Sequence, residues 1–338
     1  MAGPTVAAFT DTEHQRAYKL LASKVATMGG RKLEEDDWNS VYLQTKRFPE
    51  SGWSNTDLDI NHEGLGVESK LLKSTRKGGV SSYFGDTVMH PAGTRAVDTP
   101  EYGFGNGDAD EAAHFMVQEY ADYIRRRQNE VRENSSDGEA DLRLSLLIWE
   151  EDLSEFIYFE RRWTPPDPDD FYGEWSHNPR SSSKRQSSTS LHVYREANDE
   201  KRYSVTDPSK GVKVQPYIDV PEEDSDHLYH FVAQGETPGA SMKRRVWAPP
   251  TLDTYLKTKL GDDVDGEMLS NKIYEFADRV SSGEIDLSSD DGVESISVAE
   301  PFDITQEAYS ILQELSEASD TDALRLVARK LERNQTGT

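Results

Sequence analysis

The sequence contains no cysteine. Disulfide frameworks, thiolate nucleophiles and cysteine-ligated zinc sites are therefore excluded together. It also has no uninterrupted apolar run near the roughly 18 residues that a membrane-spanning helix needs, which excludes a membrane span. The opening residues, MAGPTVAAFTDTEHQ, lack the cationic start and the long apolar stretch of a signal peptide. We therefore expect a cytoplasmic protein with no membrane partner.

Hydrophobic residues are scarce as well, at 35% of the chain, and the mean hydropathy is −0.78. Aromatic residues nevertheless make up 9% and include six tryptophans, which argues against a wholly disordered chain because such rings need a core to bury them. With 338 residues, the chain is long enough for one large domain or two smaller ones.

Positive charge is also in short supply. Lys and Arg number 38 against 63 Asp and Glu, so the formal net charge is −25. A chain this acidic is repelled by polyanions at low salt, which weighs against nucleic acid as a partner. Two points limit the objection. At ionic strengths of about 1 M, as in a halophilic source, the Debye length shrinks to roughly 3 Å, and net charge does not describe one local groove.

The first half of the chain shows clear periodicities. Apolar residues at helical spacing predict helices over 12–28, 34–45 and 108–133, the last ending in three arginines that we expect to be exposed. Extended patterns predict a β-hairpin over 56–72 and strands over 142–149 and 154–162. The Gly-rich segment 74–107 predicts a long irregular loop inserted among these elements.

The second half is less regular. Four prolines and a serine run make 163–190 a predicted surface loop or linker. Further strands are expected at 191–196, 201–206, 211–220 and 228–234. We expect a helix in 251–281, an acidic connector over 283–303, and two amphipathic helices, 304–317 and 321–333.

The predicted hairpin brings several charged residues together. Strand alternation places Asp57 and Asp59 on one face, and Glu68 and Lys70 likewise share a face. A six-residue loop over 61–66 would place Ile60 opposite Val67, with Asp59 then opposite Glu68 and Asp57 opposite Lys70. Directly opposed Cβ atoms lie roughly 4.5–5.5 Å apart. Three carboxylates and an ammonium group would therefore crowd one patch.

Such a patch suits metal-assisted hydrolysis of a phosphodiester. Mg²⁺ prefers oxygen ligands, typically one or two carboxylates together with water and substrate phosphate. A lysine on the same face can orient the attacking water or stabilise charge on the phosphate. The alternative, purely structural interpretation is a solvent-exposed hairpin face whose cross-strand ion pairs contribute little to stability.

The spacing of Asp59 and Glu68-Ser69-Lys70 resembles the PD-(D/E)xK nuclease superfamily, to which most type II restriction endonucleases belong. The order of helix, motif hairpin, crossover helix and strand is similar too. Leu58 replaces the proline expected before the first aspartate. Some members carry a further acid on the first helix, for which Glu13 and Glu35 are the candidates.

The resemblance covers roughly residues 12–162. It implies an α/β (α+β) fold in which a restriction-endonuclease-like core, a central mixed β-sheet flanked by helices, fills residues 1–162. Asp59 and Glu68 would be ligands of Mg²⁺, and Lys70 would be the catalytic lysine. Residues 163–338 would supply further β and helical elements for recognition and dimerisation. The whole protein would act as a homodimer on double-stranded DNA.

Four cations next to the motif are expected to contact DNA phosphates, namely Lys73, Arg76, Lys77 and Arg95. A second acid-x-Lys match, Asp199-Glu200-Lys201, lies in a predicted turn, and we reject it. No glycine pattern follows a strand as in phosphate-binding or dinucleotide folds, so no nucleotide cofactor is expected.

The sequence thus predicts a Mg²⁺-dependent endonuclease, most simply a type II restriction enzyme. Two alternatives stay open. The first is a non-catalytic acidic protein that binds other proteins, imitating DNA through its carboxylates, which would account for the net charge directly. The second is a repair or recombination nuclease of the same fold.

Overall fold

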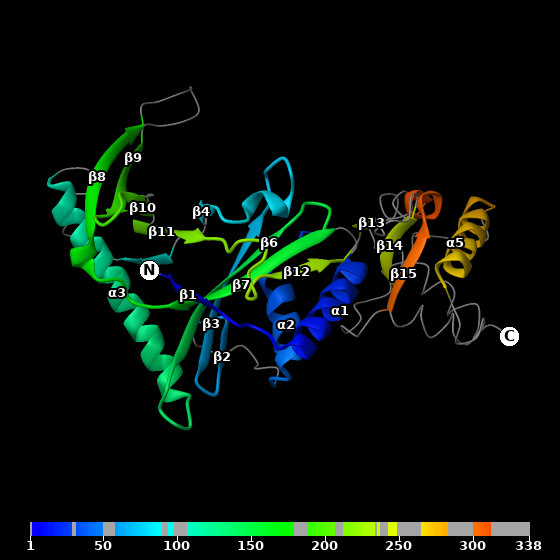
Figure 1. The fold of residues 1–338 in the computed structure, drawn as a ribbon, viewed down its shortest axis with the longest axis horizontal. Helices are drawn as coiled ribbons and strands as arrows, with labels where there is room; N and C mark the ends of the chain where they lie inside the picture. The colour runs from blue at the N-terminus through cyan, green and yellow to red at the C-terminus, as the bar shows by residue number, and fades with distance from the viewer. Residues whose placement is uncertain are drawn as a thin grey trace.

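The computed structural model describes residues 2–28, 32–49, 58–89, 94–97, 107–178, 188–206, 212–233, 235–236, 243–248, 265–282 and 300–311. The chain forms a mixed α+β protein with a central mixed β-sheet, flanking helices and a separate antiparallel sheet (Figure 1).

The central sheet has the strand order β1-β7-β6-β3-β2, and β12 also pairs with β7. Its strands are β1 (Ala2–Val6), β2 (Ile60–His62), β3 (Leu65–Lys73), β6 (Asp141–Trp149), β7 (Glu155–Trp163) and β12 (Tyr229–Val232). β3 and β6 are parallel, and every other pair is antiparallel. A parallel pair needs a long crossover, and helix α3 (Ala109–Glu133) lies within that connection.

Both faces of the central sheet are covered. Helices α1 (Asp11–Met28) and α2 (Glu35–Lys46) pack on one face, where Leu147 and Trp149 of β6 point. Helix α3 covers the other face, where Leu144 and Leu146 point. This double burial explains why β6 reads as a nearly continuous apolar run rather than an alternating one.

The second sheet has the order β4-β11-β10-β9-β8, with β5 also paired to β11. Its strands are β4 (Thr87–Met89), β5 (Thr94–Val97), β8 (Phe171–Asn178), β9 (Ser188–Arg195), β10 (Glu200–Thr206) and β11 (Val212–Asp219). Short 3₁₀ helices precede β4 (Val80–Tyr83) and β8 (Pro168–Asp170). Side chains of this sheet, α3 and the central sheet form one continuous apolar core.

A third, small sheet lies at the other end of the long axis of the molecule (Figure 1). It contains β13 (Gly235–Glu236), β14 (Lys243–Ala248) and β15 (Glu300–Thr305), and helix α5 (Gly266–Ser281) contacts β15. Residues 306–311 are helical. Within the described part of the chain, no helix is long and apolar enough to cross a membrane.

The elements predicted in the first half are confirmed for the three helices, the motif hairpin and the strands at 142–149 and 154–162. The four later strands at 191–196, 201–206, 211–220 and 228–234 are also confirmed, with shifted ends. So is the second half of the 251–281 helix, as 266–281; residues 251–264 lie outside the described residues.

Four expectations need correction. Segment 74–107 is not wholly irregular, because β4 and β5 both pair with β11. Segment 163–190 is not a linker, because β8 forms a hairpin with β9 and packs against α3. Residues 300–305 form strand β15. The end of the predicted connector 283–303 and the start of the predicted helix 304–317 are therefore wrong. The rest of that connector, residues 312–317 and the helix at 321–333 lie outside the described residues.

The predicted exposure of all three arginines of α3 is also wrong. Arg125 and Arg126 are exposed, but Arg127 is buried with only 6% of its surface accessible. It lies on the side of the helix that faces the apolar core, next to Ile124 and Val131.

A buried ion pair ties β6 to β7. Glu160 is completely buried, and its carboxylate accepts hydrogen bonds from Arg143 Nη1 at 2.7 Å and from the Tyr158 hydroxyl at 2.7 Å. Arg143 Nη1 also donates to the carbonyl of Ala7, next to β1. Removing one partner of such a pair leaves the other charge buried without compensation.

We therefore expect Glu160→Gln to lower the free energy of unfolding by roughly 2–4 kcal/mol in urea denaturation. Glu174→Gln, at an exposed position of β8, is the matched control and should change it by less than about 0.5 kcal/mol. Equal stability of the two variants would show that the pair contributes nothing.

Candidate metal and phosphodiester site

The motif hairpin has the expected register, with Ile60 opposite Val67. The strands extend further than expected, so the predicted six-residue loop is wrong. Only Glu63 and Gly64 form the turn, with φ angles of 44° and 84°. Positive φ at both central residues is the signature of a type I′ hairpin turn, which glycine favours. A Cβ on Gly64 would also lie 2.8 Å from Ser135 Oγ.

Asp59 lies directly before β2, beside β3. Ladder pairing between the two strands stops at Ile60 and Val67, and the backbone N–H of Ser69 then donates to Asp59 Oδ2 at 2.6 Å. The carboxylate thus takes the place of the next backbone acceptor. Asp57 lies outside the described residues, so its predicted place opposite Lys70 stays a prediction.

Glu68 and Lys70 share one face of β3. They pair in register with Leu144 and Leu146 of β6, whose side chains lie under α3. Lys70 Nζ lies 2.6 Å from Glu68 Oε1 and also donates to the carbonyl of Ser69 at 3.1 Å. The structure therefore brings together the three residues that the sequence predicts for the site.

Glu35 joins this group from α2. It is the first residue of the helix, and its Oε1 lies 3.9 Å from Lys70 Nζ. A capping box between Glu34 and Asp37 defines the helix start and thereby the position of Glu35. The other candidate acid, Glu13, is elsewhere, bound to Lys46 at 3.0 Å and to Thr10. Of the two, only Glu35 approaches the motif.

The acids strongly perturb one another. Burial raises the pKa of Asp59 to about 7, with Glu68 and Glu35 adding to the rise and Lys70 opposing it. Burial also raises the pKa of Glu35, again with a contribution from Glu68. Burial lowers the pKa of Lys70, but the carboxylates of Glu68, Glu35 and Asp59 outweigh it, so its net shift is upward. Lys70 is therefore a cation at neutral pH.

The donor set is suited to a hard cation. Asp59, Glu68 and Glu35 offer only oxygen atoms, which Mg²⁺ prefers. Burial is the largest cause of the raised pKa of Asp59, and the neighbouring carboxylates of Glu68 and Glu35 add to the rise against the opposing charge of Lys70. Among the described residues, however, no three His, Asp or Glu side chains already converge in metal-binding geometry. The residues fit the ion by chemistry, with side-chain adjustment needed to ligate it.

The four cations predicted to contact DNA differ in their surroundings. Lys73 pairs with Glu151. Arg76 donates to Asp86 at 2.6 Å and to the Ser82 carbonyl at 2.8 Å, and its guanidinium lies 4.2 Å from the Tyr83 ring centroid. Arg76 thus braces the segment that follows β3.

The remaining two are less constrained by the structure. Lys77 is exposed, and Arg95 lies on β5 with its side chain outside the described residues. The rejected motif is only partly in a turn. Asp199 has a φ of 56°, but Glu200 and Lys201 begin β10, and Lys201 Nζ lies 5.3 Å from the Tyr217 ring.

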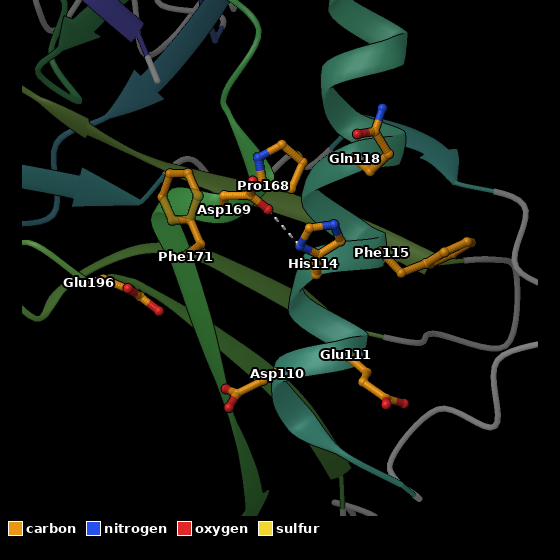
Figure 2. A pocket seen from close by; sticks show the side chains of 9 residues that line it. All are labelled: Asp110, Glu111, His114, Phe115, Gln118, Pro168, Asp169, Phe171 and Glu196. Carbon is orange, nitrogen blue, oxygen red and sulfur yellow. Dashed lines mark ion pairs between the residues drawn. The ribbon is translucent and has the colours of Figure 1, made fainter.

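A separate cavity of about 610 Å³ lies at the first turns of α3 (Figure 2). Its lining includes aromatic rings and His114, whose Nδ1 lies 3.6 Å from Asp169 Oδ1. Of the described residues that line it, none is Lys or Arg, and four carry carboxylates, namely Asp110, Glu111, Asp169 and Glu196. The sequence gives no signal for this cavity, because its walls come from α3, the turn before β8 and the residue after β9.

Neither a protein-family model, nor a curated protein, nor a solved structure matches this chain.

Replacing Asp59 tests the electrostatic cost of the cluster. A carboxyl whose folded pKa of about 7 exceeds its ordinary value of 3.8 destabilises the folded state progressively as pH rises from about 4 to above 7. We expect Asp59→Asn to raise the free energy of unfolding by roughly 1–3 kcal/mol at pH 8 and by much less at pH 5, in metal-free buffer.

The asparagine oxygen can still accept the Ser69 N–H, so the variant removes mainly the charge. Glu223→Gln, at an exposed position, is the control and should show no such pH dependence. A stability gain that is the same at both pH values would contradict the assigned pKa.

Proposed function

We propose that this protein is a Mg²⁺-dependent endonuclease that hydrolyses phosphodiester bonds in double-stranded DNA, with a restriction-endonuclease-like core and most simply of type II. The observation that carries the proposal is the convergence of Asp59, Glu68 and Lys70 on one hairpin, with Glu35 beside them. A set of solvent-exposed surface charges does not explain this convergence, because the cluster is partly buried. Burial, with contributions from Glu68 and Glu35, raises the pKa of Asp59 to about 7.

The chain topology supports the same proposal. The motif hairpin, the crossover helix α3 and the parallel strand β6 follow one another as the resemblance to the PD-(D/E)xK superfamily implies. The polar residues lie where β3 loses its β2 partner, at the border of the sheet, and a DNA backbone could reach this border without disrupting the core.

Each side chain has a role that follows from its surroundings. Asp59 and Glu68 would hold the Mg²⁺ ion, and Glu35 is the nearest further carboxylate. A bound Mg²⁺ supplies Lewis-acid polarisation of the phosphate and acidifies a coordinated water. Lys70, being protonated, stabilises negative charge on the phosphate rather than accepting a proton. The expected products carry a 5′-phosphate and a 3′-hydroxyl.

Substrate binding would use Lys73, Arg76, Lys77 and Arg95. Lys73 and Arg76 would have to exchange their present carboxylate partners, Glu151 and Asp86, for DNA phosphates. A homodimer would match two-fold-symmetric recognition sites, and most of the C-terminal segment that could support one lies outside the described residues.

A second candidate function is an acidic protein that binds a basic partner protein. The net charge of −25 and the carboxylate-lined cavity at the start of α3 favour it. It leaves the half-buried position of Lys70 among three carboxylates unexplained. A repair or recombination nuclease with the same site is the third, and only the pattern of cuts separates it from a restriction enzyme.

Lys70→Ala tests the nuclease. We expect wild-type protein with Mg²⁺ to cut duplex DNA into discrete fragments, EDTA to stop the reaction, and the variant to lose at least about 100-fold in rate while still binding DNA. Lys201→Ala, the lysine of the rejected motif, is the matched control and should cleave like the wild type.

Full cleavage by Lys70→Ala would refute the catalytic assignment. Inertness of the wild type, combined with competition against DNA for a basic protein, would favour the second candidate. Fragments without a defined sequence would point to a repair or recombination enzyme.

A further inference from the structure

Helix α3 lies very close to the strand that carries the motif. A Cβ added to Gly66 of β3 would lie 2.3 Å from Val131 Cγ2, so only glycine permits this approach. Because α3 connects to a strand parallel to β3, it runs antiparallel to β3 (Figure 1). Moving forward along β3 therefore corresponds to moving backward along α3.

The spacings of the two elements nearly match. Two residues of a strand advance about 6.6 Å, and four residues of a helix advance about 6 Å. With Val131 against Gly66, Arg127 falls level with Glu68 and Tyr123 level with Lys70. Electrostatics agree with this alignment, because Glu68 raises and Lys70 lowers the pKa of Tyr123.

Arg127 fixes the position of the Tyr123 hydroxyl through a hydrogen bond. Arg127 Nη2 donates to the hydroxyl oxygen at 3.2 Å, and the guanidinium lies 4.9 Å from the ring centroid of the same tyrosine. Arg127 Nη1 also binds Glu130 at 2.9 Å, and the Tyr123 ring packs against Trp163 at 5.9 Å. The ring and the hydroxyl oxygen are thus both constrained.

The hydroxyl hydrogen of Tyr123, unlike the ring and the oxygen, is not held by a neighbour among the described residues. Since the oxygen accepts from Arg127, the hydroxyl hydrogen remains available, and among the described residues it donates to no acceptor. Burial, chiefly, raises the pKa of Tyr123, with Glu68 adding to the rise, so the group is a neutral donor at physiological pH. A neutral donor can bind a phosphate oxygen without adding charge to the site.

We propose that Tyr123 is a substrate-contacting residue whose hydroxyl donates a hydrogen bond to a phosphate oxygen of the DNA strand held beside Glu68 and Lys70, and that Arg127 is the positioning residue that orients this hydroxyl. The inference rests on the proposed nuclease function and adds to it a contact from the crossover helix.

The test measures steady-state cleavage of duplex DNA by the full chain, with the melting temperature of each variant. Tyr123→Phe removes only the hydroxyl, and we expect a five- to thirtyfold loss of kcat/KM with an unchanged melting temperature and an unchanged Mg²⁺ requirement. Arg127→Lys should cause a similar loss. Arg126→Lys, the exposed neighbour, is the matched control and should cleave like the wild type.

The double variant decides whether Arg127 acts through Tyr123. If it does, combining Tyr123→Phe with Arg127→Lys costs no more than either change alone. Additive losses would overturn the positioning role. Should Arg127→Lys melt early, Tyr123→Phe still decides the hydroxyl contact by itself.

Lys70→Ala, assayed in parallel, distinguishes failure of the proposed nuclease function from failure of the Tyr123 contact alone. If Lys70→Ala cleaves normally, or the wild type cuts no DNA, the proposed function fails. If Lys70→Ala is inactive and Tyr123→Phe keeps wild-type kcat/KM, only the present inference fails. A raised Mg²⁺ requirement in Tyr123→Phe would assign the hydroxyl to the metal carboxylates instead and would overturn the phosphate contact.

Discussion

The pairing of Ile60 with Val67 is the constraint on which the candidate site depends. Both side chains are buried beneath α1 and α2, and the two-residue turn admits no other register without changing its length. Because side chains alternate along a strand, a slip of one residue would turn Glu68 and Lys70 toward the apolar residues beneath α1 and α2. The apolar residues of the hairpin therefore determine where its charged residues lie.

The charged cluster is costly to the folded state. Desolvation and mutual repulsion raise the pKa of Asp59, whereas the fully buried Glu160 is balanced by Arg143 and a tyrosine hydroxyl. The half-buried Asp59 and the fully buried Glu160 thus differ in kind. Glu160 has the partners expected of a group that stabilises a fold, whereas Asp59 has neighbouring carboxylates that raise its pKa and make it a candidate ligand in the proposed cation site.

Segments with strong local periodicity were predictable, as 108–133 and 142–149 illustrate, because helix and strand spacing depends on neighbours in the chain. The prediction for segment 163–190 was wrong because contacts distant along the chain, not local composition, determine its structure. Its prolines and serines are typical of a loop, yet Phe171 and Trp175 of β8 pack against the α3 core, and that contact overrides local composition. Segment 74–107 likewise acquires strands only because β11 is there to pair with them.

The sequence by itself determined that Glu68 and Lys70 share a face of β3, since this follows from strand alternation. It predicted Asp59 opposite Glu68, but the ladder ends at Ile60 and Val67, and the Asp59 carboxylate accepts from the Ser69 N–H instead. Only the tertiary structure decided that Glu35, not Glu13, completes the cluster. Both acids lie in the first turn of a helix and look alike in sequence, and which one approaches β3 depends on how α2 packs on the sheet. Burial of charge is likewise a property of contacts distant along the chain, which no local pattern records.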